Sequence, residues 1–389
     1  MSGARLIGID LARLVAVAGM MGAHTLSVGE PQPAAVTALV DGPPSTLFAV
    51  LGGVSVVLAA RARLAAGERS AAVRATLGRG AVVALLGLLV IPFAAAVYVV
   101  LVPFGVAIVL AAGLLLLPSW ALAALAVVLA TVGGWIAAFA RLHLPGLEGT
   151  HGILSLAADP LGTLIDVTLS GVYPVLTWVT YVAIGMLVAR ALLAARAAAR
   201  ERRALVAVGA IGAVLIVTGV LSSELGLRMV AAGAGGGLAL DRSVMLANGY
   251  GAAPGIEPVL QLIAAPHTGT PADIARTVGM ALVVIAALGL LAAALPPRAL
   301  RLLEPLRAAG AAPLTIYVLH VVLLTLLGST LSQTAPALVG GWGAWALQLG
   351  VALAIGGVLA ASRARGPLEL LVGAAAVRAA GARDRALPR

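Results

Sequence analysis

The sequence predicts an all-α fold, a polytopic bundle of about ten transmembrane helices with both termini in the cytoplasm. Of the 389 residues, 61% are hydrophobic and only 10% are charged, whereas soluble domains average about 25% charged residues. Apolar runs of nearly 20 residues recur along the chain, which is the length needed to cross a bilayer as a helix. The basic residues lie in short patches between these runs.

Ten apolar runs define the expected spans. In chain order they cover residues 7–25, 45–60, 79–95, 97–117, 119–140, 172–194, 204–222, 272–295, 309–330 and 342–362. The second run is short, and Pro92 lies near the break between the third and the fourth. The first run is expected to be a retained span rather than a signal peptide, because Asp10 and Arg13 interrupt its apolar part.

The orientation of the bundle follows from its arginines, which make up all 25 basic residues. The loops on the side of the two termini hold 20 of them, the opposite loops hold four, and Arg13 lies within the first span. Positive loops face the cytoplasm, so the loops 26–44, 141–171 and 223–271 are expected outside. This placement also explains the net charge of +10, so we expect a lipid bilayer, in the plasma membrane, and no nucleic acid as a partner.

The chain is expected to form one membrane domain, residues 1–365, followed by a short C-terminal region, residues 366–389. That region predicts an interfacial helix after Pro367 and a basic tail. The absence of cysteine excludes disulfides, thiolate nucleophiles and cysteine-based metal sites. His143, Glu148 and His151 share a loop, but their spacing matches no standard ligand pattern, so no metal is expected.

The first span carries three polar residues, Asp10, Arg13 and His24. At about 100° per residue, His24 lies about 20° and Asp10 about 60° from Arg13 around the helix axis. A charged side chain at membrane depth costs roughly 2.5 to 3.5 kcal/mol and usually faces the protein interior. The stripe is therefore a candidate functional site. The alternative is a buried Asp10–Arg13 pair that orients the helix, with His24 incidental.

Asp41 lies just outside the second span, where Pro43 and Pro44 can open the helix. The end of the first span emerges nearby, so we expect Asp41 to orient His24, because a histidine base commonly needs an acceptor on its other nitrogen. The alternative is an ordinary loop acid at the start of a helix.

Other polar and aromatic residues cluster at the ends of later spans. Tyr173 and Trp178 open the sixth span, as interfacial anchors or as a platform for a sugar ring. His267 and Thr268 precede the eighth span and are candidates for contacting a polar substrate.

Local spacing adds two expectations. Thr270 is predicted to cap the eighth span, whose first helical residue is a proline. Tyr317 and His320 share one face of the ninth span, so they either hydrogen-bond each other or contact substrate.

The motifs resemble those of a known family. Arg13 followed eleven positions later by His24 resembles the motif of the membrane-bound acyltransferase-3 family. The opening GIDLARLVAVAGMM resembles more closely the catalytic domain of the heparan-alpha-glucosaminide N-acetyltransferase family and its bacterial relatives. So do YPVLTWVTYVAIGM (173–186), PHTGTPADIARTVG (266–279) and PLTIYVLH (313–320).

The resemblance implies transfer of an acetyl or other acyl group from cytoplasmic acyl-CoA to a hydroxyl or amine of an extracytoplasmic glycan or lipid-linked sugar. Arg13 with Asp10 would then bind the coenzyme and His24 would act as the base or the acyl carrier. The runner-up is a transporter or lipid flippase that uses the Asp10, Arg13 and His24 stripe as an ion or proton relay. A third reading is a non-catalytic membrane partner. A homodimer is left open.

Overall fold

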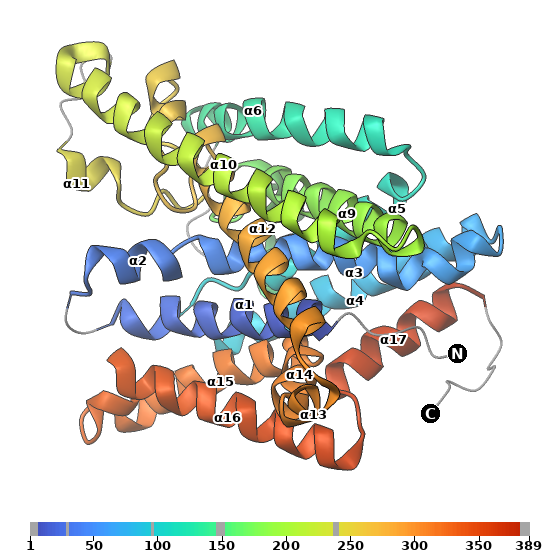
Figure 1. Cartoon of the computed structure of the whole chain (residues 1–389). Helices are drawn as coiled ribbons and strands as arrows, with labels where there is room; N and C mark the ends of the chain where they lie inside the picture. The colour runs from blue at the N-terminus through green and yellow to red at the C-terminus, as the bar shows by residue number, and fades with distance from the viewer. Residues whose placement is uncertain (1–6, 29–30, 95–96, 145–151, 236–240, 382–389) are drawn as a thin grey trace.

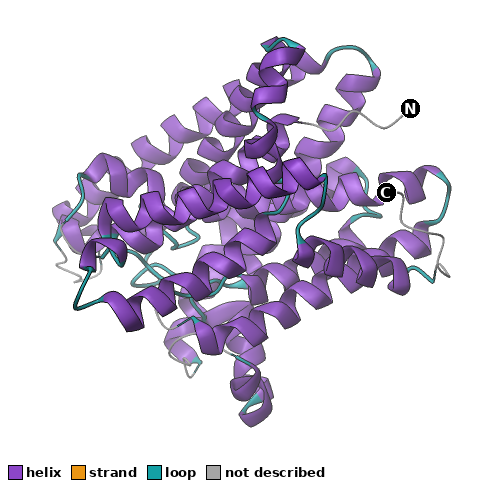
Figure 2. Ribbon diagram, turned by 90° about the horizontal axis from the view of Figure 1, so that it is seen from below, coloured by secondary structure: helices purple, strands orange, loops and turns teal. Residues whose placement is uncertain are grey.

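The computed structural model describes residues 7–28, 31–94, 97–144, 152–235 and 241–381. Throughout these ranges the regular secondary structure is helical and includes no strand (Figure 2). The predicted all-α class is therefore confirmed.

Nine helices in the described ranges are long and apolar enough to cross a membrane. They are α1 (Ile7–Leu26), α3 (Pro43–Ala65), α4 (Arg69–Val90), α6 (Ser119–His143), α9 (Val175–Ala197), α10 (Glu201–Met229), α12 (Pro271–Ala294), α15 (Pro313–Leu331) and α16 (Gly341–Ser362). Most of them run along a common direction or its opposite (Figure 1).

The predicted fourth span, 97–117, is a shorter helix, α5 (Leu101–Leu114). At 1.5 Å per residue it is about 21 Å long, less than the roughly 30 Å of a hydrocarbon core. The cause lies at Pro92, where α4 gives way to a 3₁₀ turn, η1 (Ile91–Phe93). Residues 97–100, just before α5, are also non-helical. α5 packs against α4 and α9, so it completes the bundle as a short tenth helix.

Short helices cover the two ends of the bundle. At one end lie α2 (Ala34–Val40), α7 (Ile153–Ala158), α8 (Pro160–Ile165), η2 (Asp166–Ser170), η3 (Val230–Ala234), α11 (Arg242–Met245), η4 (Pro258–Leu262) and η5 (Pro336–Leu338). At the other lie α13 (Pro297–Leu302), α14 (Glu304–Gly310) and α17 (Pro367–Ala379). The helix predicted after Pro367 is thus present, while the basic tail from 382 to 389 lies outside the described residues.

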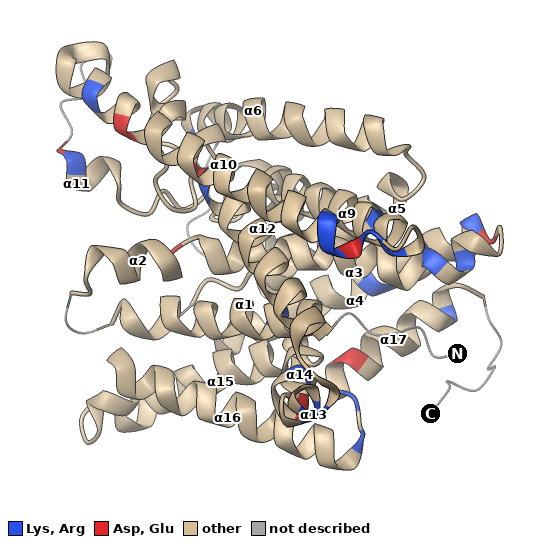
Figure 3. Ribbon diagram, viewed as in Figure 1, with Lys and Arg blue, Asp and Glu red and all other residues tan. Residues whose placement is uncertain are grey.

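The charges are distributed unevenly between these two ends (Figure 3). Most of the described arginines lie in the connections α3–α4, α9–α10, α12–α15 and α16–α17 or on the parts of the helices next to them; we call this the arginine-rich end. The opposite end carries the three described outer histidines, His24, His143 and His267, and we call it the histidine end. The positive-inside rule predicts that the arginine-rich end faces the cytoplasm.

Small residues allow the closest helix contacts. A Cβ on Gly53 of α3 would overlap the carbonyl of Val182, and one on Gly185 of α9 would overlap that of Val50. These two glycines let the backbones of α3 and α9 touch, as in small-residue interfaces of membrane helices. α1 packs against α3, α12, α14, α15 and α16, so its polar side chains face other helices.

The orientation can be tested with single cysteines, because the chain has none of its own. A cysteine at Ala198, exposed between α9 and α10, should react with a membrane-impermeant thiol reagent only from the cytoplasmic side. A cysteine at Ser243, exposed on α11, should react only from outside. Labelling of the Ala198 position from outside would overturn the predicted orientation.

Candidate functional site

A cavity of about 650 Å³ lies at the arginine-rich end; we call it the arginine cavity. Its polar lining is mainly cationic and consists of Arg13, Ser55, Arg61, Arg79, Arg307, Arg365 and Glu369. Its inner part is apolar and includes Phe48 and Phe104. A concave site with several guanidinium groups is suited to an anionic ligand, because arginine binds phosphate and carboxylate groups in a bidentate manner.

The carboxylate of Asp10 holds two of these arginines in place. Arg13 Nη1 donates to Asp10 Oδ1 at 2.6 Å, and Arg307 Nη1 donates to Asp10 Oδ2 at 3.3 Å. Arg13 Nη2 donates to Ser55 Oγ at 2.8 Å. Gly310 makes the contact between α14 and α1 possible, because a Cβ there would overlap the Asp10 carbonyl. The Asp10–Arg13 pair considered from the sequence is therefore present, and Arg307 joins it.

The C-terminal helix α17 forms one wall of the arginine cavity. Glu369 Oε1 accepts from the backbone N–H groups of Leu314 and Thr315 at 2.7 and 3.2 Å, at the start of α15. A carboxylate at a helix N-terminus satisfies donors that the helix itself leaves unpaired. Glu369 thereby reaches the cavity from the C-terminal region, and Arg365 reaches it from the connection just before α17. The sequence predicted this helix without its role as a cavity wall.

A second cavity, of about 480 Å³, lies at the histidine end; we call it the histidine cavity. Its lining brings together residues from five separate segments, among them His24, Asp41, Tyr98, Tyr173, Asn248, Tyr250 and His267. Arg13 and His24 thus line different cavities, separated by roughly 16 Å along α1 at 1.5 Å per residue.

His24 is held by a second histidine. His24 Nδ1 lies 2.9 Å from His320 Nε2, with the two ring planes within 6° of parallel. His320 is 2% exposed on α15, and the buried amide of Gln348 lies beside it. Because Nδ1 of His24 is engaged with His320, Nε2 is the nitrogen that remains for a ligand in the cavity.

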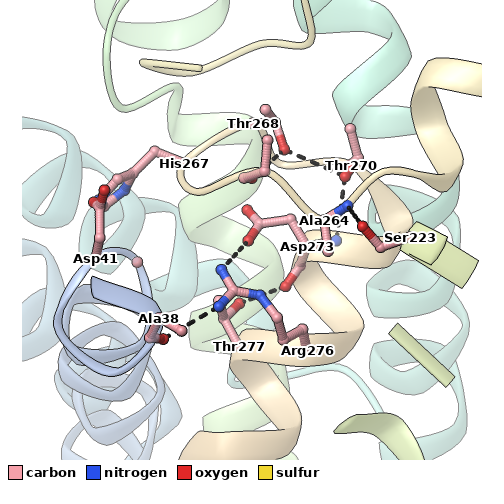
Figure 4. A network of polar contacts seen from close by, with 12 residues as sticks. Ala38, Asp41, Ser223, Ala264, His267, Thr268, Thr270, Asp273, Arg276 and Thr277 are labelled. Carbon is pink, nitrogen blue, oxygen red and sulfur yellow. Dashed lines mark hydrogen bonds and ion pairs between the residues drawn. The ribbon is translucent and has the colours of Figure 1, made fainter. Parts of the chain in front are cut away.

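Asp41 does not pair with His24, and that prediction is wrong. Its Oδ1 lies 3.2 Å from His267 Nε2 and accepts from Asn248 Nδ2 at 3.1 Å; Figure 4 shows Asp41 and His267 facing each other. The reason is the short helix α2, which ends just before Asp41 and directs the Asp41 carboxylate toward the loop that precedes α12. Local spacing contains no sign of this contact, because the two partners lie more than 200 residues apart.

The loop before α12 is fixed by backbone bonds and by its threonines. His267 adopts a φ of 57°, in the left-handed region that non-glycine residues rarely occupy. Thr270 caps α12 by accepting from the Asp273 N–H at 3.2 Å, as predicted (Figure 4). Thr268 is 1% exposed and donates to the Ala265 carbonyl at 2.7 Å. Thr268 therefore shapes the loop and does not line the histidine cavity.

The aromatic residues predicted from the sequence divide between cavity and core. Tyr173 lines the histidine cavity. Trp178 is 3% exposed inside the bundle, so its interpretation as an interfacial anchor is wrong. Tyr317 is fully buried and its hydroxyl accepts from the Val100 N–H at 3.3 Å. It does not pair with His320, and neither of these two residues lines the arginine cavity or the histidine cavity.

Two phenols at the histidine cavity stay neutral near physiological pH. Burial raises the pKa of the Tyr173 hydroxyl, and neighbouring Tyr317 adds to the effect. Burial also raises the pKa of Tyr250, whose ring packs on Tyr98 with centroids 5.4 Å apart. Both hydroxyls therefore remain available as hydrogen-bond donors.

Arg141 ties together the loops that cover this cavity. Its guanidinium donates to the carbonyls of Ser170, Gly171, Gly249 and Tyr250. From the sequence, Arg141 and Arg307 indicated only the orientation of the bundle. Asn248 and Tyr250 were not among the predicted site residues, although the run 248–251, Asn-Gly-Tyr-Gly, is a turn signal with polar side chains on an outside loop.

The histidines considered for metal binding are only partly described. His143 Nδ1 lies 2.9 Å from the Phe139 carbonyl within α6. Glu148 and His151 lie outside the described residues.

The apolar helices and the two polar cavities define the class of the molecule, a polytopic membrane protein with a cavity at each end of its bundle. Residues 5–222, more than half of the chain, match the family described as heparan-alpha-glucosaminide N-acetyltransferase, catalytic. The chain belongs to this family and is a membrane acetyltransferase by that membership. A search of curated proteins found no match. The matched residues include Arg13, His24 and Asp41, while His267 and His320 lie beyond them.

Proposed function

We propose that the protein transfers an acetyl or other acyl group from cytoplasmic acyl-CoA to a hydroxyl or amine of an extracytoplasmic glycan or lipid-linked sugar, in the plasma membrane. The observation that carries this proposal is the pair of cavities at opposite ends of one bundle, one lined by arginines and one by histidines and a carboxylate. A reaction between ligands from opposite sides of a membrane requires such a pair.

The arginine cavity is the proposed donor site. Coenzyme A carries phosphate groups, for which guanidinium forks provide paired hydrogen bonds. Asp10 and Ser55 hold Arg13, while Glu304 and Asp10 hold Arg307. Because these side chains are already oriented, less rotamer entropy is lost when the coenzyme binds.

The histidine cavity is the proposed acceptor site, with His24 as the general base. Nε2 of His24 takes the proton of the attacking hydroxyl or amine, whose oxygen or nitrogen then attacks the thioester carbonyl, and the coenzyme leaves as its thiolate. His320 fixes the orientation of the His24 ring through Nδ1, as a partner on the other nitrogen does for many histidine bases. Attack by His24 itself, giving an acyl-histidine, uses the same nitrogen.

His267 and Asp41 are proposed to position the acceptor. Asp41 Oδ1 lies 3.2 Å from His267 Nε2 and orients the imidazole ring, so that Nδ1 of His267 is the nitrogen left to contact a hydroxyl group of the sugar. The neutral hydroxyls of Tyr173 and Tyr250 supply donors to the same cavity.

An ion relay along α1 is less well supported. Such a relay needs polar groups between Arg13 and His24, yet Val17 and Met20, which lie between them, are apolar and buried. Arg13 and His24 also line different cavities. The geometry therefore favours two binding sites over one continuous polar path.

The role of His24 predicts a loss of turnover with little loss of coenzyme binding. His24→Ala, and His24→Asn, which keeps a hydrogen-bonding group, should each lower kcat by about 10²- to 10⁴-fold, measured by transfer from labelled acetyl-CoA to an amino sugar acceptor. His143→Ala is the matched control, since His143 lies on the same end but does not line the cavity. Normal turnover by the Asn variant would mean that His24 is not the base.

The proposed role of Arg13 predicts a loss of coenzyme binding. Arg13→Lys keeps the charge but cannot contact Asp10 and Ser55 with two separate nitrogens of a planar group. It should weaken acetyl-CoA binding roughly tenfold, the equivalent of one lost hydrogen bond to a charged group, measured by calorimetry on purified protein. Arg69→Lys, on the exposed start of α4, should bind normally. If Arg13→Lys binds acetyl-CoA with unchanged affinity, Arg13 has a structural role only.

A further inference from the structure

A chain of aromatic rings links the linings of the two cavities. Phe104 lines the arginine cavity and Tyr173 lines the histidine cavity. Between them lies Trp178, whose ring centroid is 5.8 Å from that of Phe104 and 5.9 Å from that of Tyr173. Along this path one lining residue of each cavity packs against the same buried indole ring.

A second set of contacts also links the linings of the two cavities. The ring of Phe48, in the arginine cavity, lies 6.2 Å from that of Tyr317. The Tyr317 hydroxyl accepts from the N–H of Val100, which lines the histidine cavity. Phe48 and Phe104 stand near the ends of α3 and α5 that face the histidine end, so they form the innermost surface of the arginine cavity.

Phe104 occupies a space that a glycine provides. Gly52 of α3 also lines the arginine cavity, and a Cβ on it would overlap the tip of the Phe104 ring. On its other sides the ring packs on Phe48, with centroids 4.9 Å apart, and edge-on against Trp178. Phe104 is thus fixed in position by three neighbours and is 7% exposed.

We propose that Phe104, seated against Gly52, sets the length of the acyl group that the enzyme accepts. This inference rests on the proposed function, in which the acyl end of the coenzyme reaches the inner surface of the arginine cavity. A short acyl group fits in front of the ring, whereas a longer chain needs the volume that the ring fills. In such pockets one methylene changes selectivity by about 10- to 200-fold.

The two residues allow substitutions with opposite expected effects. Phe104→Leu removes ring volume and should raise the ratio of kcat/KM for butyryl-CoA to that for acetyl-CoA by at least about tenfold. Gly52→Ala pushes the Phe104 ring into the cavity. It should lower the ratio of kcat/KM for propionyl-CoA to that for acetyl-CoA. Phe93→Leu is the matched control, because Phe93 is 60% exposed and lines neither cavity; it should leave both ratios unchanged.

Equilibrium binding of the same three acyl-CoA esters separates this inference from the proposed function. A relative gain in butyryl-CoA affinity in Phe104→Leu supports the inference even if the unaltered protein transfers no acyl group, in which case only the proposed function fails. If Phe104→Leu is folded by size-exclusion chromatography and shows unchanged chain-length ratios in both binding and transfer, the inference is overturned. If Gly52→Ala does not fold, the result for Phe104→Leu alone tests the inference.

Discussion

A polar side chain at membrane depth must find a polar partner inside the protein, and this constraint organises the whole bundle. Two polar groups of α1 are subject to this constraint. Near one end, Asp10 is satisfied by Arg13 and Arg307. Near the other end, His24 is satisfied by His320. Because a single helix carries both groups, packing α1 against its neighbours assembles the two cavities together.

The partners that satisfy these groups come from distant parts of the chain. Arg307 arrives on α14, which can approach α1 only because Gly310 has no side chain. Glu369 brings α17 to the start of α15 and closes one side of the arginine cavity. At the histidine end, Arg141 donates hydrogen bonds to four loop carbonyls. Each cavity is therefore a product of long-range contacts between otherwise apolar helices.

Much of the fold could be predicted from the sequence, because long apolar runs have few alternatives to a membrane helix. The helix cap at Thr270 and the polar stripe on α1 could also be predicted, since both depend on residues close in sequence. The pairing of Asp41 with His267 could not, because it depends on where a seven-residue helix, α2, directs one carboxylate. The burial of Trp178 and the short α5 likewise follow from packing and from the break after α4, which hydropathy alone does not resolve.

The proposed function depends most on donor and acceptor entering from opposite ends of the bundle. Proteoliposomes with uniformly oriented protein test it directly, when labelled acetyl-CoA and an amino sugar acceptor are supplied on the same side or on opposite sides. The proposed function predicts acetylated sugar only when acetyl-CoA is on the arginine-rich side and the acceptor is on the histidine side. Product formed with both substrates on one side, and none when they are separated, would contradict it.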